Sequence, residues 1–96
     1  MIPREDFIWT IGYDGAAAVV DGQAKRRYGS LSTVQLAEKG LFRAAYAAAV
    51  YSRAPQDMLA VVEAYNKAAG TTYTVSSPLE RLFGVFPVDV KRTILL

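Results

Sequence analysis

The sequence predicts an α+β fold in which a small antiparallel three-stranded meander packs on three to four short helices. An alternating apolar stretch near the N-terminus is followed by two Asp-Gly turn signals, and helical periodicity dominates the middle of the chain. No linker or low-complexity tract divides the sequence. We therefore expect residues 1–96 to form a single domain, which the C-terminal stretch could complete with a further strand.

The meander is expected in the first third of the chain. Phe7–Tyr13 alternates with a period of two and is rich in aromatic and β-branched residues, as strands are. Asp14-Gly15 tolerates the positive φ angles of a type I′ turn, so Ala16–Val20 can return as the second strand. Asp21-Gly22 repeats this turn signal and predicts a third strand over Gln23–Tyr28.

The predicted core centres on Ser32–Arg53, which is apolar on almost every side. A helix of this kind is normally a buried element that several neighbours contact. The serine at its start can cap it, and Gln35 can complete a capping box. Gly40 either kinks one helix or ends a first one, and we favour two pieces, Ser32–Lys39 and Leu41–Ser52.

The remaining elements follow from terminal signals. Proline is favoured at the first helical position and glycine just beyond the last, which predicts a helix over Pro55–Ala69 that Gly70 ends. Thr71–Val75 is short and β-prone. A Ser-Pro-x-Glu start signal predicts a short helix over Pro78–Phe83. Val88–Leu96 alternates as a strand does, and it is also compatible with a terminal helical turn.

Composition restricts the available chemistry. The chain has no cysteine, which excludes disulfides and thiolate sites, and no histidine, the commonest general base and metal ligand. A net charge of +2 permits a polyanionic partner without requiring one. The sequence has neither a signal-peptide pattern nor the roughly 18 consecutive apolar residues of a membrane span. We expect a cytoplasmic protein without membrane contact.

The acidic residues give no pattern that is typical of an active site. Asp14 and Asp21 occupy turns at opposite ends of the expected meander, while Glu5 and Asp6 are adjacent and would point to opposite faces of a strand. Glycines and serines form neither a phosphate-binding loop nor a nucleophile elbow. We predict no catalytic, cofactor-binding or metal-binding residues, and a carboxylate-dependent enzyme is the least favoured hypothesis.

The leading hypothesis is a non-enzymatic interaction module that binds a protein partner or a second copy of itself. A small sheet can cover one side of the Ala- and Tyr-rich central helix and the helix from Pro55 a second, so the remaining apolar side is buried either within the chain or by a second copy. Small residues beside aromatic rings are well suited to a self-association face. The candidate self-association residues are Phe42, Ala45, Tyr46, Ala49 and Val50.

The alternative hypothesis is a weak nucleic-acid-binding domain that uses the basic third strand. Aromatic and basic side chains on a sheet can stack on bases and contact phosphates. An edge strand that its basic residues protect against pairing with other chains explains the same run without a ligand. The candidate nucleic-acid contacts are Lys25, Arg26, Arg27, Tyr28 and Arg43.

Overall fold

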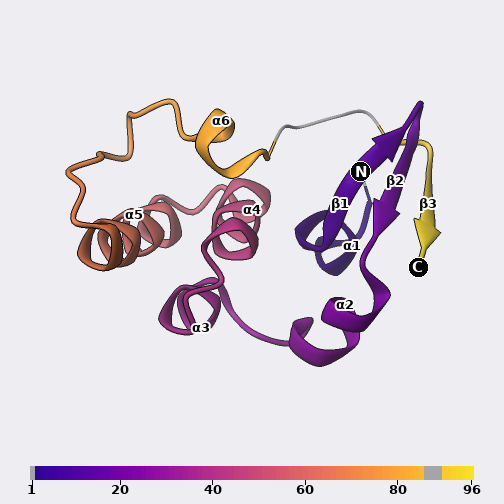
Figure 1. Ribbon diagram of the computed structural model, residues 1–96, viewed down its shortest axis with the longest axis horizontal. Coiled ribbons are helices and arrows are strands. Elements are labelled where there is room, and N and C mark those ends of the chain that lie inside the picture. The colour runs from indigo at the N-terminus through magenta and orange to yellow at the C-terminus, as the bar shows by residue number, and fades with distance from the viewer. Residues whose placement is uncertain (1, 86–89) are drawn as a thin grey trace. The chain divides into compact units, whose positions relative to one another are not determined.

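The computed structural model describes residues 2–85 and 90–96, which belong to two compact units (Figure 1). Unit 1 is Met1–Ser30 with Pro87–Leu96, and unit 2 is Leu31–Phe86. The α+β class is confirmed, with one three-stranded sheet among the described residues. The prediction of three to four helices is wrong, because the described residues contain six, two of which form in the N-terminal region where strands were expected. The elements are α1 Arg4–Ile8, β1 Thr10–Asp14, β2 Ala17–Val20, α2 Gly22–Tyr28, α3 Thr33–Glu38, α4 Phe42–Ser52, α5 Pro55–Ala69, α6 Glu80–Phe83 and β3 Arg92–Leu95.

The sheet of unit 1 is mixed, so the prediction of an antiparallel meander is wrong in its third strand. β1 and β2 are antiparallel, as the first Asp-Gly turn predicts, but β2 pairs in parallel with β3 from the C-terminus. A parallel pair needs a long connection, and here unit 2 supplies it. The predicted C-terminal strand is confirmed over Arg92–Leu95, whereas residues 88 and 89 of that prediction lie outside the described residues.

The predicted third strand, Gln23–Tyr28, is part of helix α2 instead. The Asp21 side chain accepts a hydrogen bond from the backbone amide of Ala24 at 3.1 Å and so caps the helix. Lys and Arg are good helix formers, which favours this outcome once the cap is made. The second Asp-Gly pair therefore begins a helix and does not turn a hairpin.

The predicted first strand begins later than its alternation indicates. Residues Arg4–Ile8 form α1, with two carboxylates in its first turn, where the helix dipole favours negative charge. The Thr10 hydroxyl donates to the backbone oxygen of Asp6 at 2.7 Å and fixes the passage from helix to strand. β1 then runs from Thr10 to Asp14, with an irregular register between Thr10 and Gly12.

In unit 2 the stretch Ser32–Arg53 contains two helices, which is one of the two alternatives that the sequence left open. The Ser32 hydroxyl accepts a hydrogen bond from the backbone N–H of Gln35 at 3.2 Å. The side-chain oxygen of Gln35 in turn accepts from the backbone N–H of Ser32 at 2.9 Å, which completes a capping box. Gly40 has a φ of +78°, a left-handed conformation that glycine adopts without steric cost. The chain turns there, so α3 and α4 are separate helices.

Helix α4 is the core of unit 2. Helices α3, α5 and α6 contact it (Figure 1). The ring of Tyr46 stacks on Phe83 with centroids 4.9 Å apart, and Phe42 meets Tyr65 edge-on at 5.3 Å. The alanines of α4 let its neighbours approach closely. All residues from Ala44 to Ala49 are buried, as expected for a helix that is apolar on most sides.

Side-chain hydrogen bonds hold the segment that follows α5. The Asn66 side chain accepts from the Tyr73 amide at 3.0 Å and donates to the Tyr73 carbonyl at 2.8 Å. These bonds occupy the backbone groups that a strand would use, so the β-prone stretch Thr71–Val75 is not a strand. The next predicted helix, Pro78–Phe83, is confirmed in its second part as α6.

Candidate functional site

The described carboxylates do not gather as a metal-binding group. In the ranges 2–85 and 90–96, no three acidic residues gather as a metal ion would require. Asp6 is buried, and the amine of Lys25 lies 2.6 Å from its carboxylate, so this charge stabilises the contact between α1 and α2. Among the helices that the structure describes, none combines the length and apolar character needed to cross a membrane.

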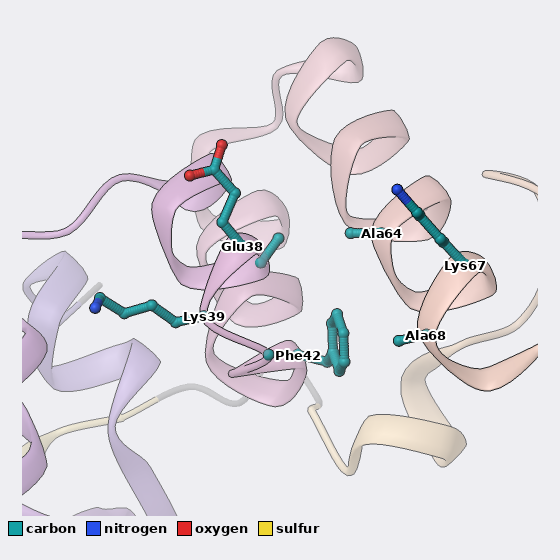
Figure 2. Close-up of a pocket in the computed structure, with 8 residues that line it drawn as sticks. Glu38, Lys39, Phe42, Ala64, Lys67 and Ala68 are labelled. Carbon is teal, nitrogen blue, oxygen red and sulfur yellow. The ribbon is translucent and has the colours of Figure 1, made fainter.

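Unit 2 contains a groove of about 650 Å³ between the α3–α4 turn and α5. Figure 2 shows the Phe42 ring standing between the two walls, with the methyl groups of Ala64 and Ala68 on the α5 side. Ala37 adds apolar surface from α3. The lining is therefore mainly apolar and open to solvent.

The local sequence explains why this space is not filled. Gly40 has no side chain, and its left-handed turn brings the end of α3 next to the start of α4. On α5, alanines recur at every fourth position, so Ala60, Ala64 and Ala68 share one face of the helix. These methyl groups are too small to reach the opposite wall. The groove results from small residues on both sides of Phe42.

Charged side chains of opposite sign border the groove. Glu38 extends from the α3 wall and Lys67 from the α5 wall, whereas the Lys39 side chain extends away from α5 (Figure 2). Lys67 lies in the last turn of α5, where a cation complements the helix dipole. Neither Glu38 nor Lys67 has an ion-pair partner among the described residues. An apolar ligand with a base toward α3 and an acid toward α5 would match these charges.

The five candidate self-association residues are not equally accessible. Ala45, Tyr46 and Ala49 are 0%, 3% and 2% exposed, so the folded chain already covers them. Phe42 and Val50 are half-buried, and Phe42 lines the groove. Self-association through the Ala/Tyr-rich helix stays a prediction for these two positions, since periodicity shows that a face is apolar but not whether a neighbour covers it.

The phenol of Tyr46 belongs to the interior of unit 2. Burial raises the pKa of this group above its ordinary value of 10.0, and the negative charge of Glu80 raises it further. Its ring is stacked on Phe83. We interpret the shift as a consequence of packing and not as a sign of catalysis.

The candidate nucleic-acid contacts on α2 interact mainly within unit 1. Lys25 is paired with Asp6, and the guanidinium of Arg27 lies 5.3 Å from the centroid of the Tyr28 ring. That ring is itself 5.8 Å from Trp9. Because of these contacts, fewer side chains of the basic run are available to bind a phosphate backbone.

The two remaining candidate nucleic-acid contacts are exposed. Arg26 belongs to unit 1 and Arg43 to unit 2. A phosphate backbone is bound by several cations on one surface. The described geometry provides no such row of unpaired cations on α2, and nucleic-acid binding stays a prediction.

Unit 1 exposes a second apolar region at one end of its sheet. Ile11 and Tyr13 on β1 are 57% and 40% exposed. In the register of the sheet, Asp14 on β1 lies opposite Ala17 on β2, which in turn lies opposite Arg92 on β3. An acid and a base therefore flank the middle strand. We call the β1–β2 turn with these flanking residues the sheet end.

The groove and the sheet end both combine apolar surface with charges that have no ion-pair partner in the described part of the chain. No protein-family model matches this chain, and no curated protein or solved structure is significantly similar to it.

Proposed function

We propose that this protein is a small non-enzymatic interaction module that self-associates through the groove of unit 2. The observation that carries this proposal is the solvent-accessible apolar lining around Phe42, with a volume of about 650 Å³. Covering such surface stabilises a complex by roughly 25 cal/mol for each Å² of apolar area removed from water. A groove of this size accommodates the side chains of a short segment.

The surface around the groove extends this apolar area. Val34 lies one helical turn before Glu38 on α3 and is 43% exposed. Ala60 stands one turn before Ala64 on α5 and is half-buried. Stable protein interfaces bury about 1,200–2,000 Å² in total, so a partner must cover these flanks as well as the groove.

A second copy of the chain is the occupant that we propose. The chain itself exposes apolar side chains beside an acid and a base at the sheet end. Closed two-fold association is the commonest way in which soluble proteins assemble. Self-association therefore uses two surfaces that are each left open by the described elements of their own unit.

Sedimentation equilibrium over a wide range of concentration tests this function. We expect the parent to reach the mass of two chains and Ala68→Glu, which places a charge in the groove, to remain near the mass of one chain. Ala69→Glu is the matched control, because Ala69 is an exposed alanine on the same helix that does not line the groove. A parent that stays a monomer at millimolar concentration would refute the proposal.

A further inference from the structure

We infer that the groove of one copy receives the sheet end of a second copy, with Asp14 facing Lys67 and Arg92 facing Glu38. This inference depends on the proposed self-association and adds the docking element and its orientation. It follows from the arrangement of charge on two surfaces that are each defined within their own unit.

The spacing of charges is the first reason for this inference. On the sheet end, Asp14 and Arg92 lie on strands that are separated by β2, so their backbones are about 9–10 Å apart. On the groove, Glu38 and Lys67 rise from two packed helices, whose axes are typically 8–10 Å apart. The spacing of the two strands is similar to the usual spacing of packed helices, and the signs are opposite when the acid of the sheet end lies over the α5 wall.

The absence of competing partners is the second reason. Within the described residues, none of the four side chains Asp14, Arg92, Glu38 and Lys67 takes part in an ion pair. Bringing them together on association replaces four solvated charges by two pairs. Such pairs contribute modestly to affinity but strongly to orientation, because the reversed arrangement places like charges together.

The shape of the sheet end is the third reason. The β1–β2 turn consists of small residues, since Gly15 and Ala16 link the strands and both are exposed. A narrow turn of this kind can enter a groove that large side chains could not.

Other exposed apolar residues match the groove less well. Leu95 and Leu96 are exposed beside Arg92, with no acid on the same strand. Tyr73 and Val75 lie in a segment without charged residues. The sheet end combines small, exposed turn residues with both signs of charge on one face of the sheet.

Charge reversal tests the orientation. We expect Asp14→Lys or Lys67→Glu alone to raise the dissociation constant about tenfold, because each converts an attraction into a repulsion. The double variant Asp14→Lys/Lys67→Glu restores the attraction and should return close to the parent value. Arg92→Glu and Glu38→Arg should behave in the same way. Arg53→Glu, an exposed reversal at the opposite end of α4 from Phe42 and outside the groove lining, is the control and should change nothing.

Cysteine cross-linking provides an independent measurement, because the chain has no native cysteine. A mixture of Ala16→Cys and Ala68→Cys chains should form a mixed disulfide on mild oxidation, whereas Ala16→Cys with Ala69→Cys should give far less. Far-UV circular dichroism verifies that every variant is folded.

The outcomes separate this inference from the proposed function. If Ala68→Glu dissociates the dimer but Asp14→Lys and Arg92→Glu leave the dissociation constant unchanged, a different surface occupies the groove and the inference is wrong, while self-association stands. Failure of the double variant to recover also overturns the proposed pairing. A parent that is always monomeric refutes both.

Discussion

The two units are built on different kinds of contact. Unit 2 is assembled from helices that follow one another along the chain, and each packs on α4 or its neighbour. Unit 1 is completed only when β3, from the far end of the sequence, pairs with β2. Local signals are therefore sufficient to place the helices of unit 2, whereas unit 1 depends on a pairing that no local signal specifies.

The interiors of the units differ as well. Unit 2 is held by alanine packing and by rings, such as Tyr46 stacked on Phe83. Unit 1 buries the carboxylate of Asp6 against Lys25 and places the only tryptophan of the chain, Trp9, in its interior. The difference gives each unit its own spectroscopic signal, since Trp9 fluorescence reports on unit 1 and the helical circular dichroism largely on unit 2.

The largest expected effect is in the core of unit 2. Ala45→Glu buries a charge at a fully covered position, and we expect the free energy of unfolding to fall by about 4 kcal/mol or more. Urea unfolding followed by circular dichroism measures this loss, and Ala69→Glu is the exposed control. If residues 1–96 form a single domain, Trp9 fluorescence will change in the same transition. A fluorescence transition that stays at the parent midpoint would show two independent domains.

A smaller loss of stability is expected at Gly22, which lies against the C-terminal residue that follows β3. A Cβ atom at Gly22 would overlap the backbone oxygen of Leu96, so Gly22→Ala must displace the end of the chain. Overpacking of this kind costs about 1–3 kcal/mol, and we expect Trp9 fluorescence to show it. Gly12→Ala, where a Cβ would meet no neighbour within 4 Å, is the control. Equal loss of stability in the two variants would contradict the importance of this close approach.

The smallest expected effect is the change of folding stability with pH that Tyr46 causes. Because the pKa of Tyr46 is raised in the folded state, its contribution to stability is complete below about pH 10, the unfolded value. It is lost as the pH rises through the folded pKa. We expect the parent to lose stability over this range more steeply than Tyr46→Phe, as measured by thermal unfolding. Identical pH profiles would show that Tyr46 does not titrate differently in the two states.

Sequence signals predicted the structure best where the residue that starts or ends an element lies within one helical turn of its partner. The capping box of Ser32 and Gln35 and the helix that Gly70 ends occur as predicted, and Gly40 interrupts the helical stretch, as expected, by ending α3. Asp21 shows the limit of such signals, because Asp-Gly suits a hairpin turn and Asp is also a strong helix cap. Contacts with the surrounding chain decided that Asp21 caps a helix and does not form a hairpin turn.

The groove was not predicted, although its components can be read in the sequence. Alanines at positions 60, 64 and 68 mark one face of α5, and Gly40 marks the turn that borders it. Nothing in this spacing indicates that the face stays open. The same limit explains why Ala45, Tyr46 and Ala49 were candidate contacts, since an apolar pattern is identical for an inner and an outer face.

The sequence by itself determined the α+β class, the first hairpin, the break at Gly40 and the ends of α5. These depend on backbone preferences and caps that act over a few neighbouring residues. Only the tertiary structure decided that β3 pairs in parallel with β2, that α4 is covered within unit 2 and that an open groove beside Phe42 lies between charged walls. These features arise from burial and pairing between distant segments, whose free energies depend on which surfaces meet.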